Sequence, residues 1–92
     1  MAYIYMYTAP NGKKYVGQTK TSLKKRRKDD YGTGYVGSPC FWHAIQYFNG
    51  LTNFTREILE TVNEEELDEK ERYWIEKENS LVPYGYNIDK GG

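Results

Sequence analysis

Residues 3–18 read YIYMYTAPNGKKYVGQ and contain two short runs of strand-forming residues, 3–7 and 14–18. The segment Ala9-Pro10-Asn11-Gly12 separates them, and its Asn-Gly pair is typical of a tight turn between two strands. The stretch therefore predicts an N-terminal β-hairpin. Tyr5 and Tyr15, ten positions apart across the turn, can then lie near one another, either as ordinary cross-strand aromatic packing or as functional groups.

Two helices are expected after the hairpin. Thr21 or Ser22 can cap a helix over residues 23–30, and the glycine-spaced stretch that follows should end it. Pro39 suits the first turn of a second helix over residues 39–48.

The second half of the chain predicts one more strand and one more helix. Residues 54–60 read as the strand, and Asn63 with Glu66 forms a capping-box pattern ahead of a helix over residues 64–78. A short extended piece is expected over residues 86–88. The fold class is α+β: a small three-stranded, mainly antiparallel sheet flanked by about three helices, in a single domain of residues 1–92.

Composition limits the kinds of site and location that the protein can have. No apolar run approaches the roughly 20 residues of a membrane span, and no secretory leader is recognisable, which predicts a soluble, intracellular, cytoplasmic protein without membrane contact. The single cysteine, Cys40, cannot form an internal disulfide, and with one histidine it offers no zinc-finger or cysteine-rich metal spacing. A metal ion would therefore be held mainly by oxygen.

The formal net charge of +0 conceals a segregation of charge along the chain. Residues 13–28 hold eight lysines and arginines and no acid, whereas residues 57–71 hold eight acids and one lysine. If the two segments lie on different faces, one face carries a positive field that attracts phosphate. Two solvated helices of opposite charge would give the same pattern.

Glu71 breaks the pattern of its own helix. Leu67, Glu71, Trp74 and Ile75 fall on one stripe, so this carboxylate lies among apolar side chains. An ionised group in such a place needs a basic partner, a raised pKa or a bound cation.

The order of these motifs resembles the GIY-YIG nucleases, whose two tripeptides lie on such a hairpin. The matching segments span nearly the whole chain: Tyr3-Ile4-Tyr5, Tyr15-Val16-Gly17, the basic run after Ser22, Glu71 to Ile75, and Gly85-Tyr86-Asn87. Tyr3 replaces the first glycine of the family, and Gln18 stands where some relatives carry a lysine.

The resemblance implies a metal-dependent DNA endonuclease. Its catalytic residues would be Tyr5, Tyr15, Arg26 and Glu71, with Glu71 as the ligand of Mg²⁺ or Mn²⁺. Arg26 follows Leu23 by nearly one helical turn and so turns toward the hairpin; the neighbouring Arg27 is the alternative. Which tyrosine acts as the base stays open.

Further residues take secondary roles in this interpretation. His43 lies among apolar residues and is either a structural hydrogen-bonder or a group near the site. Asn87 would orient groups in the site or simply stabilise a turn. Four basic side chains would bind DNA: Lys24, Lys25, Arg27 and Lys28.

Double-stranded DNA is the expected partner, read by a separate or removed recognition domain, because the chain has no base-reading motif of its own. A catalytically inactive DNA-binding domain and a protein-interaction domain are the alternatives. Nicking that requires a divalent ion would exclude the first, and strongly salt-dependent DNA binding would exclude the second.

Overall fold

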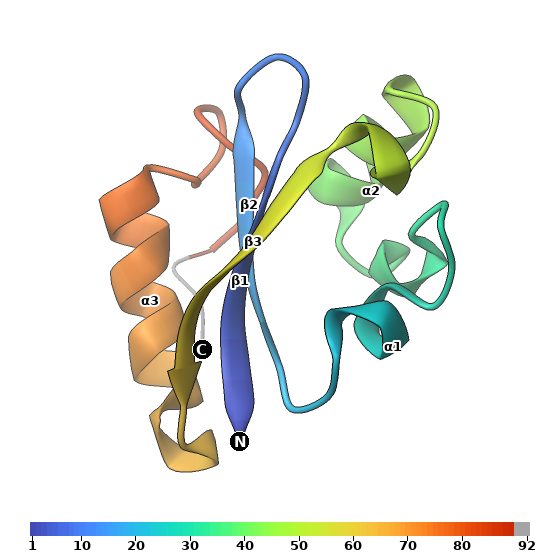
Figure 1. Ribbon diagram of the computed structural model, residues 1–92. Coiled ribbons are helices and arrows are strands. Elements are labelled where there is room, and N and C mark those ends of the chain that lie inside the picture. The colour runs from blue at the N-terminus through green and yellow to red at the C-terminus, as the bar shows by residue number, and fades with distance from the viewer. Residues whose placement is uncertain (90–92) are drawn as a thin grey trace.

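The computed structural model describes residues 1–89 and has a three-stranded sheet at its centre (Figure 1). The strands are β1 (Ala2–Thr8), β2 (Lys14–Thr19) and β3 (Thr55–Val62), in the order β2-β1-β3 with both pairs antiparallel. Helices α1 (Leu23–Arg27) and α2 (Pro39–Tyr47) lie on one side of the sheet, and α3 (Leu67–Glu78) lies on the other. This arrangement confirms the α+β class and the three-stranded sheet.

β1 is buried on both faces because it lies between two strands and two helical layers. Its odd-numbered side chains join an aromatic cluster under α2, which comprises Tyr5, Tyr7, Ala9, Tyr35, Phe41, Ala44, Ile45, Leu51 and Phe54. Its even-numbered side chains join a smaller aliphatic cluster under α3, which comprises Ala2, Ile4, Met6, Val16, Val62, Leu67 and Ile75. The basic run at α1 and the acidic run at α3 therefore lie on opposite faces of the sheet.

The hairpin forms as predicted, with a different turn. Gly12 N–H donates to the Ala9 carbonyl and Ala9 N–H to the Lys13 carbonyl, so Pro10 and Asn11 occupy the centre of the turn. Gly12 takes the next position with a φ of 87°, which favours glycine. This places Tyr7 opposite Tyr15 and Tyr5 opposite Gly17, so that Tyr5 and Tyr15 are diagonal neighbours on one face.

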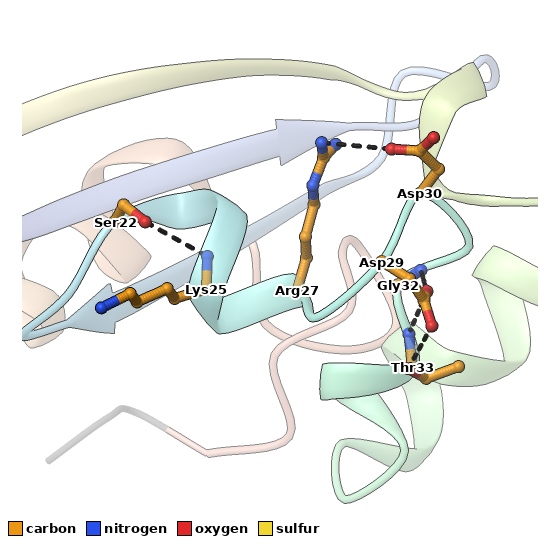
Figure 2. A network of polar contacts seen from close by, with 7 residues as sticks. All are labelled: Ser22, Lys25, Arg27, Asp29, Asp30, Gly32 and Thr33. Carbon is orange, nitrogen blue, oxygen red and sulfur yellow. Dashed lines mark hydrogen bonds and ion pairs between the residues drawn. The ribbon is translucent and has the colours of Figure 1, made fainter.

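α1 ends three residues earlier than predicted. Ser22 caps it, with Oγ accepting from Lys25 N–H at 3.2 Å, but Lys28 takes a φ of 70° and ends the helix. The Asp29 carboxylate then accepts from Gly32 N–H, Thr33 N–H and Thr33 Oγ1 (Figure 2). These bonds favour the 3₁₀ turn η1 (Thr33–Tyr35) over a continuation of α1. The reason is that the Asp29 carboxylate satisfies the first backbone N–H groups of η1, which have no acceptor within the turn.

The other boundaries are close to the predicted ones, apart from the start of α3. α2 ends one residue early, and a 3₁₀ turn, η2 (Leu51–Asn53), precedes β3. The capping box is wrong: no side chain caps this end, and residues Glu64–Glu66 form a 3₁₀ turn, η3, closed by Glu66 N–H and the Asn63 carbonyl. The described residues contain no helix long and apolar enough to cross a membrane.

The chain after α3 returns to the outer edge of β2. Tyr86 N–H donates to the Lys14 carbonyl, and the Asn87 side chain completes the contact. Its Oδ1 accepts from Val16 N–H at 2.9 Å and from Ser80 Oγ at 2.6 Å, while its Nδ2 donates to the Val16 carbonyl at 2.8 Å. Asn87 thus pairs with β2 as a neighbouring strand would, and the extended piece expected there is a single bridge between Leu81 and Asn87.

Asn87→Ala should destabilise the fold by about 2 to 4 kcal/mol, because it removes three buried hydrogen bonds and leaves Val16 and Ser80 unsatisfied. Guanidinium unfolding measures the loss. Asn63→Ala is the matched control: Asn63 is exposed and makes no capping bond, so its removal should change stability by less than about 0.5 kcal/mol. Equal effects of the two substitutions would contradict this account of Asn87.

Candidate active site

A cavity of about 210 Å³ lies beside the outer edge of β2, where the two helical layers and the C-terminal segment meet. Its wall contains three of the side chains singled out in the sequence: Tyr15 from β2, Glu71 from α3 and Asn87 from the C-terminal segment. The remaining lining residues are Gly37, Ser38, Tyr86, Ile88 and Asp89. A larger depression of about 480 Å³ lies elsewhere on α3, at Arg72 and Leu81, and contains none of the candidates.

Tyr15 packs against the aromatic cluster and lines the cavity. Its ring stacks on Phe41, with centroids 4.1 Å apart and planes inclined by 3°, and its hydroxyl lies 3.4 Å from Ser38 Oγ. Burial raises the pKa of Tyr15 above its usual value; the Ser38 contact and the charge of Arg26 oppose that rise, while Glu71 adds to it. The charges of Arg26 and Glu71, which lie on opposite sides of the sheet, therefore influence the pKa of this phenol in opposite directions.

Tyr5 is fully buried and does not line the cavity. Its hydroxyl accepts a hydrogen bond from the Tyr35 hydroxyl at 2.9 Å. Burial raises the pKa of Tyr5 far above the ordinary range, and the negative charge of an ionised Tyr15 would raise it further. The ring crosses β2 at Gly17, where an added Cβ would overlap Cζ and the hydroxyl oxygen of Tyr5. The glycine of the second tripeptide thus provides space for the tyrosine of the first.

The adjacent arginines differ in their partners. The Arg26 guanidinium lies over the Tyr35 ring, 4.4 Å from its centroid, and Nη1 donates to the Gly34 carbonyl. Arg27 instead pairs with Asp30 at 3.3 Å (Figure 2). It also lines a groove of about 390 Å³ together with Lys24 and Arg56.

Glu71 is half-buried and meets an amide from the neighbouring strand. Gln18 Nε2 donates to Glu71 Oε1 at 3.2 Å and to Asp68 Oδ1 at 3.0 Å, so one neutral side chain connects two carboxylates of α3. The position of Glu71 on the stripe of Leu67 and Ile75, which are both buried, is as predicted. Because Gln18 adds no charge, the negative charge of the two acids is not neutralised by it.

The structure leaves His43 away from the cavity. His43 is exposed and lines a different groove, of about 380 Å³, with Cys40, Lys13 and Pro83. Lys24, Lys25 and Lys28 are exposed around α1. Asn87 lies in the cavity wall, yet its Oδ1 and one N–H of its amide are engaged with β2 and Ser80.

Sequence reasoning missed four residues of this region: Gln18, Tyr35, Ser38 and Asp89. In the sequence Gln18 stands out only as a departure from relatives that carry lysine. Tyr35 follows three positions after Gly32, and its glycine-spaced surroundings indicated nothing more than a loop. Ser38 and Asp89 stand in no recognisable motif, so only the folded chain brings them to Tyr15 and Glu71.

The donor set of the cavity suits a hard cation better than a zinc ion. Within residues 1–89 no three histidine, cysteine or carboxylate side chains gather closely enough to enclose a metal ion. Glu71 and Asp89 both line the cavity, and neither nitrogen nor sulfur ligands accompany them in its described wall. Mg²⁺ and Mn²⁺ accept carboxylate oxygens, and Mg²⁺ commonly keeps several waters, so these residues fit such an ion.

Comparison with solved structures finds the same fold in a characterised nuclease domain. The catalytic domain of homing endonuclease I-TevI is 30% identical in sequence, with a TM-score of 0.77 over 97% of this chain and 99% of that chain. A glutamate-to-alanine mutant of the catalytic domain of intron endonuclease I-TevI gives 28% identity and a TM-score of 0.79 over 100% of this chain and 98% of that chain. No protein-family model and no curated protein matches the sequence significantly.

The buried tyrosines should make the protein sensitive to alkali. Burial raises the pKa of Tyr5, Tyr7, Tyr15 and Tyr35 above the value near 10 that each has in the unfolded chain. Their contribution to stability is complete below pH 10 and is lost as the pH rises from there toward the folded pKa values, because only the unfolded chain releases these protons.

The free energy of unfolding should therefore be level up to about pH 9.5 and then fall by up to about 1.4 kcal/mol per pH unit for each such tyrosine. Guanidinium unfolding at intervals from about pH 8 to 11.5 measures this slope. Tyr7→Phe should reduce the slope by the share of one tyrosine. Constant stability through pH 11 would contradict the burial of these phenols.

Gly17→Ala should cost about 1 to 3 kcal/mol of stability, since the new methyl group overlaps Tyr5 and the packed ring must shift. Gly37→Ala is the control, because a Cβ at Gly37 meets open space; it should change the unfolding free energy by less than about 0.5 kcal/mol. Thermal melts of both variants decide the matter, and a Gly17→Ala protein as stable as wild type would refute the contact.

Proposed function

Because the chain belongs to the GIY-YIG endonuclease family, we propose that it is a metal-dependent nuclease that hydrolyses a phosphodiester bond of double-stranded DNA. The observation that carries this proposal is the cavity beside β2. Tyr15 and Glu71 line it, and the charge of Arg26, which is not itself among the lining residues, acts on Tyr15 at the edge of the sheet. A phosphate needs a cationic side chain and a metal-binding carboxylate on the same side of a water-accessible space.

Glu71 would hold the cation, Mg²⁺ or Mn²⁺, with Asp89 as a second oxygen donor in the same wall. A bound divalent ion would neutralise charge on the phosphate and on the leaving oxygen. Gln18 keeps the Glu71 carboxylate in place without cancelling its charge. One or two carboxylates bind Mg²⁺ weakly, so affinity should rise when a phosphodiester supplies further oxygens.

We assign the contact with the attacking water to Tyr15 rather than to Tyr5. Tyr15 lines the cavity, whereas Tyr5 is fully buried beneath Gly17. The raised pKa of Tyr15 keeps it a neutral phenol at pH 7, so its hydroxyl would orient the water by a hydrogen bond. Tyr5, which lies behind the cavity wall, would act only as a hydrogen-bond donor to groups of that wall.

Arg26 would bind the non-bridging oxygens of the phosphate. A guanidinium has five N–H donors, and the Gly34 carbonyl uses one of them, so others are left for phosphate oxygens. Lys24, Lys25, Arg27 and Lys28 would contact the DNA backbone around α1. We further propose that residues 1–92 form a single nuclease domain, and that base recognition comes from a separate or removed domain.

Glu71→Gln should lower the rate of nicking of supercoiled plasmid in Mg²⁺ by roughly 100-fold or more, because it removes the charge that holds the cation. Fold and DNA binding should be nearly unchanged. Glu69→Gln, at an exposed position of the same helix, is the matched control and should nick at the wild-type rate. Gel analysis with and without Mg²⁺ provides the measurement.

The same variants separate the proposal from a structural role of Glu71. If Glu71 belonged to a structural ion pair, Glu71→Gln would leave a cation unpaired and lower stability by about 3 to 5 kcal/mol. A large fall in Tm together with wild-type nicking at low temperature would eliminate the metal site. Wild-type protein that binds DNA but never nicks it in Mg²⁺ or Mn²⁺ would instead indicate a catalytically inactive binding domain.

A further inference from the structure

Tyr35 contacts three of the four side chains to which catalysis is assigned. Its hydroxyl donates to the Tyr5 hydroxyl at 2.9 Å, its ring lies 4.4 Å from the Arg26 Cζ, and its edge meets the Tyr15 ring with centroids 5.8 Å apart. We infer that Tyr35 is a positioning residue of the nuclease site, whose ring holds the Arg26 guanidinium and whose hydroxyl orients Tyr5. The inference rests on the proposed function.

The ring holds Arg26 without cancelling its charge. Within residues 1–89 no carboxylate lies at ion-pair distance from Arg26, and its contacts are a π face and the Gly34 carbonyl. Arg27, one position away, is paired with Asp30. An aromatic face stabilises a cation but leaves its net charge available to an anion. Arg26 is thus fixed in direction and still fully positive when phosphate arrives.

The hydroxyl of Tyr35 sets the hydrogen-bonding role of Tyr5. Both phenols are buried, and Tyr35 is the donor, so the oxygen of Tyr5 is occupied as an acceptor. The single hydroxyl hydrogen of Tyr5 is then left for an acceptor elsewhere. Because that hydroxyl borders Gly17, it points toward the strand that carries Tyr15.

The turn that carries Tyr35 is itself held in place. The Asp29 carboxylate accepts from Gly32 N–H at 2.8 Å and from Thr33 Oγ1 at 2.7 Å, which fixes the start of η1 (Figure 2). Gly34 packs so closely on the Arg26 carbonyl that an added Cβ would overlap it. The Tyr35 ring therefore has little freedom relative to the backbone of Arg26.

Three variants test the inference: Tyr35→Phe keeps the ring, Tyr35→Leu removes ring and hydroxyl, and Tyr7→Phe is the control. Tyr7 belongs to the same aromatic cluster, 5.9 Å from Tyr35 between ring centroids, and its buried hydroxyl makes no hydrogen bond of normal geometry within the described chain. Each variant is first checked by thermal melting, so that rates are compared only among folded proteins.

The rates should separate the two roles of Tyr35. Single-turnover nicking should fall about 10-fold in Tyr35→Phe and roughly 100-fold in Tyr35→Leu, because small displacements of a reacting group have effects of this size. Tyr7→Phe should stay within about 2-fold of wild type. In a Tyr5→Phe background, Tyr35→Phe should cause no further loss, since the hydrogen bond is already absent.

A spectroscopic arm tests the ring without relying on cleavage. The side-chain proton resonances of Arg26 should be shifted upfield by the Tyr35 ring in wild type and Tyr35→Phe, and should return to ordinary positions in Tyr35→Leu. Unchanged Arg26 resonances in Tyr35→Leu, or wild-type nicking by that variant, would overturn the inference. A wild-type protein that fails to nick DNA would defeat the proposed function, while the resonances would still decide whether Tyr35 holds Arg26.

Discussion

The hydrogen bond from Tyr35 to Tyr5 joins two hydroxyls in an interior that water does not reach, and much of the structure follows from it. A core built on tyrosine gains ring area but loses stability wherever a buried phenolic oxygen lacks a partner of normal geometry, as the Tyr7 hydroxyl does within residues 1–89, so the bond that Tyr5 makes is valuable. The partner of Tyr5 comes from 30 positions later in the chain. This hydrogen bond joins η1 to β1. The same Tyr35 side chain provides the ring over which the Arg26 guanidinium lies.

The elements with local signals could be predicted from the sequence. The hairpin follows from strand-forming residues around a turn, α2 from Pro39, and the stripe on α3 from its 3.6-residue period. The errors lie where a side chain had two possible partners. The Asp29 carboxylate accepts from the turn that follows it, and α1 does not continue through it. At Asn63 the backbone carbonyl, and not the side chain, accepts the hydrogen bond that closes the turn. The choice between such partners depends on the surrounding packing, which short-range patterns do not contain.

The candidate site divides in the same way. Tyr15, Glu71 and Asn87 stand in motifs and line one cavity. Three further residues belong to the site only through contacts made in the folded chain: Gln18, Ser38 and Asp89. No motif in the sequence around them indicates a functional role. His43 illustrates the converse. Its apolar neighbours in the sequence suggest a position near the core, yet His43 is exposed on α2, in a groove away from the cavity. Site residues that stand in a motif of fixed spacing can be predicted from the sequence. Site residues that meet only because the chain folds back on itself cannot.

The pairing of Asn87 with Val16 has a consequence for the newly made protein. During synthesis the hairpin is made before the segment that pairs with it, and the backbone groups of Val16 on its outer edge lack their partner until Asn87 has been added, 71 positions later. At about 5 to 20 residues per second this interval lasts roughly 4 to 14 seconds. An open strand edge is a template for pairing with other chains, so the nascent chain is exposed to misassembly during that time. The same delay keeps the cavity wall incomplete, so the proposed nuclease site cannot form before the segment that contains Asn87 has been synthesised.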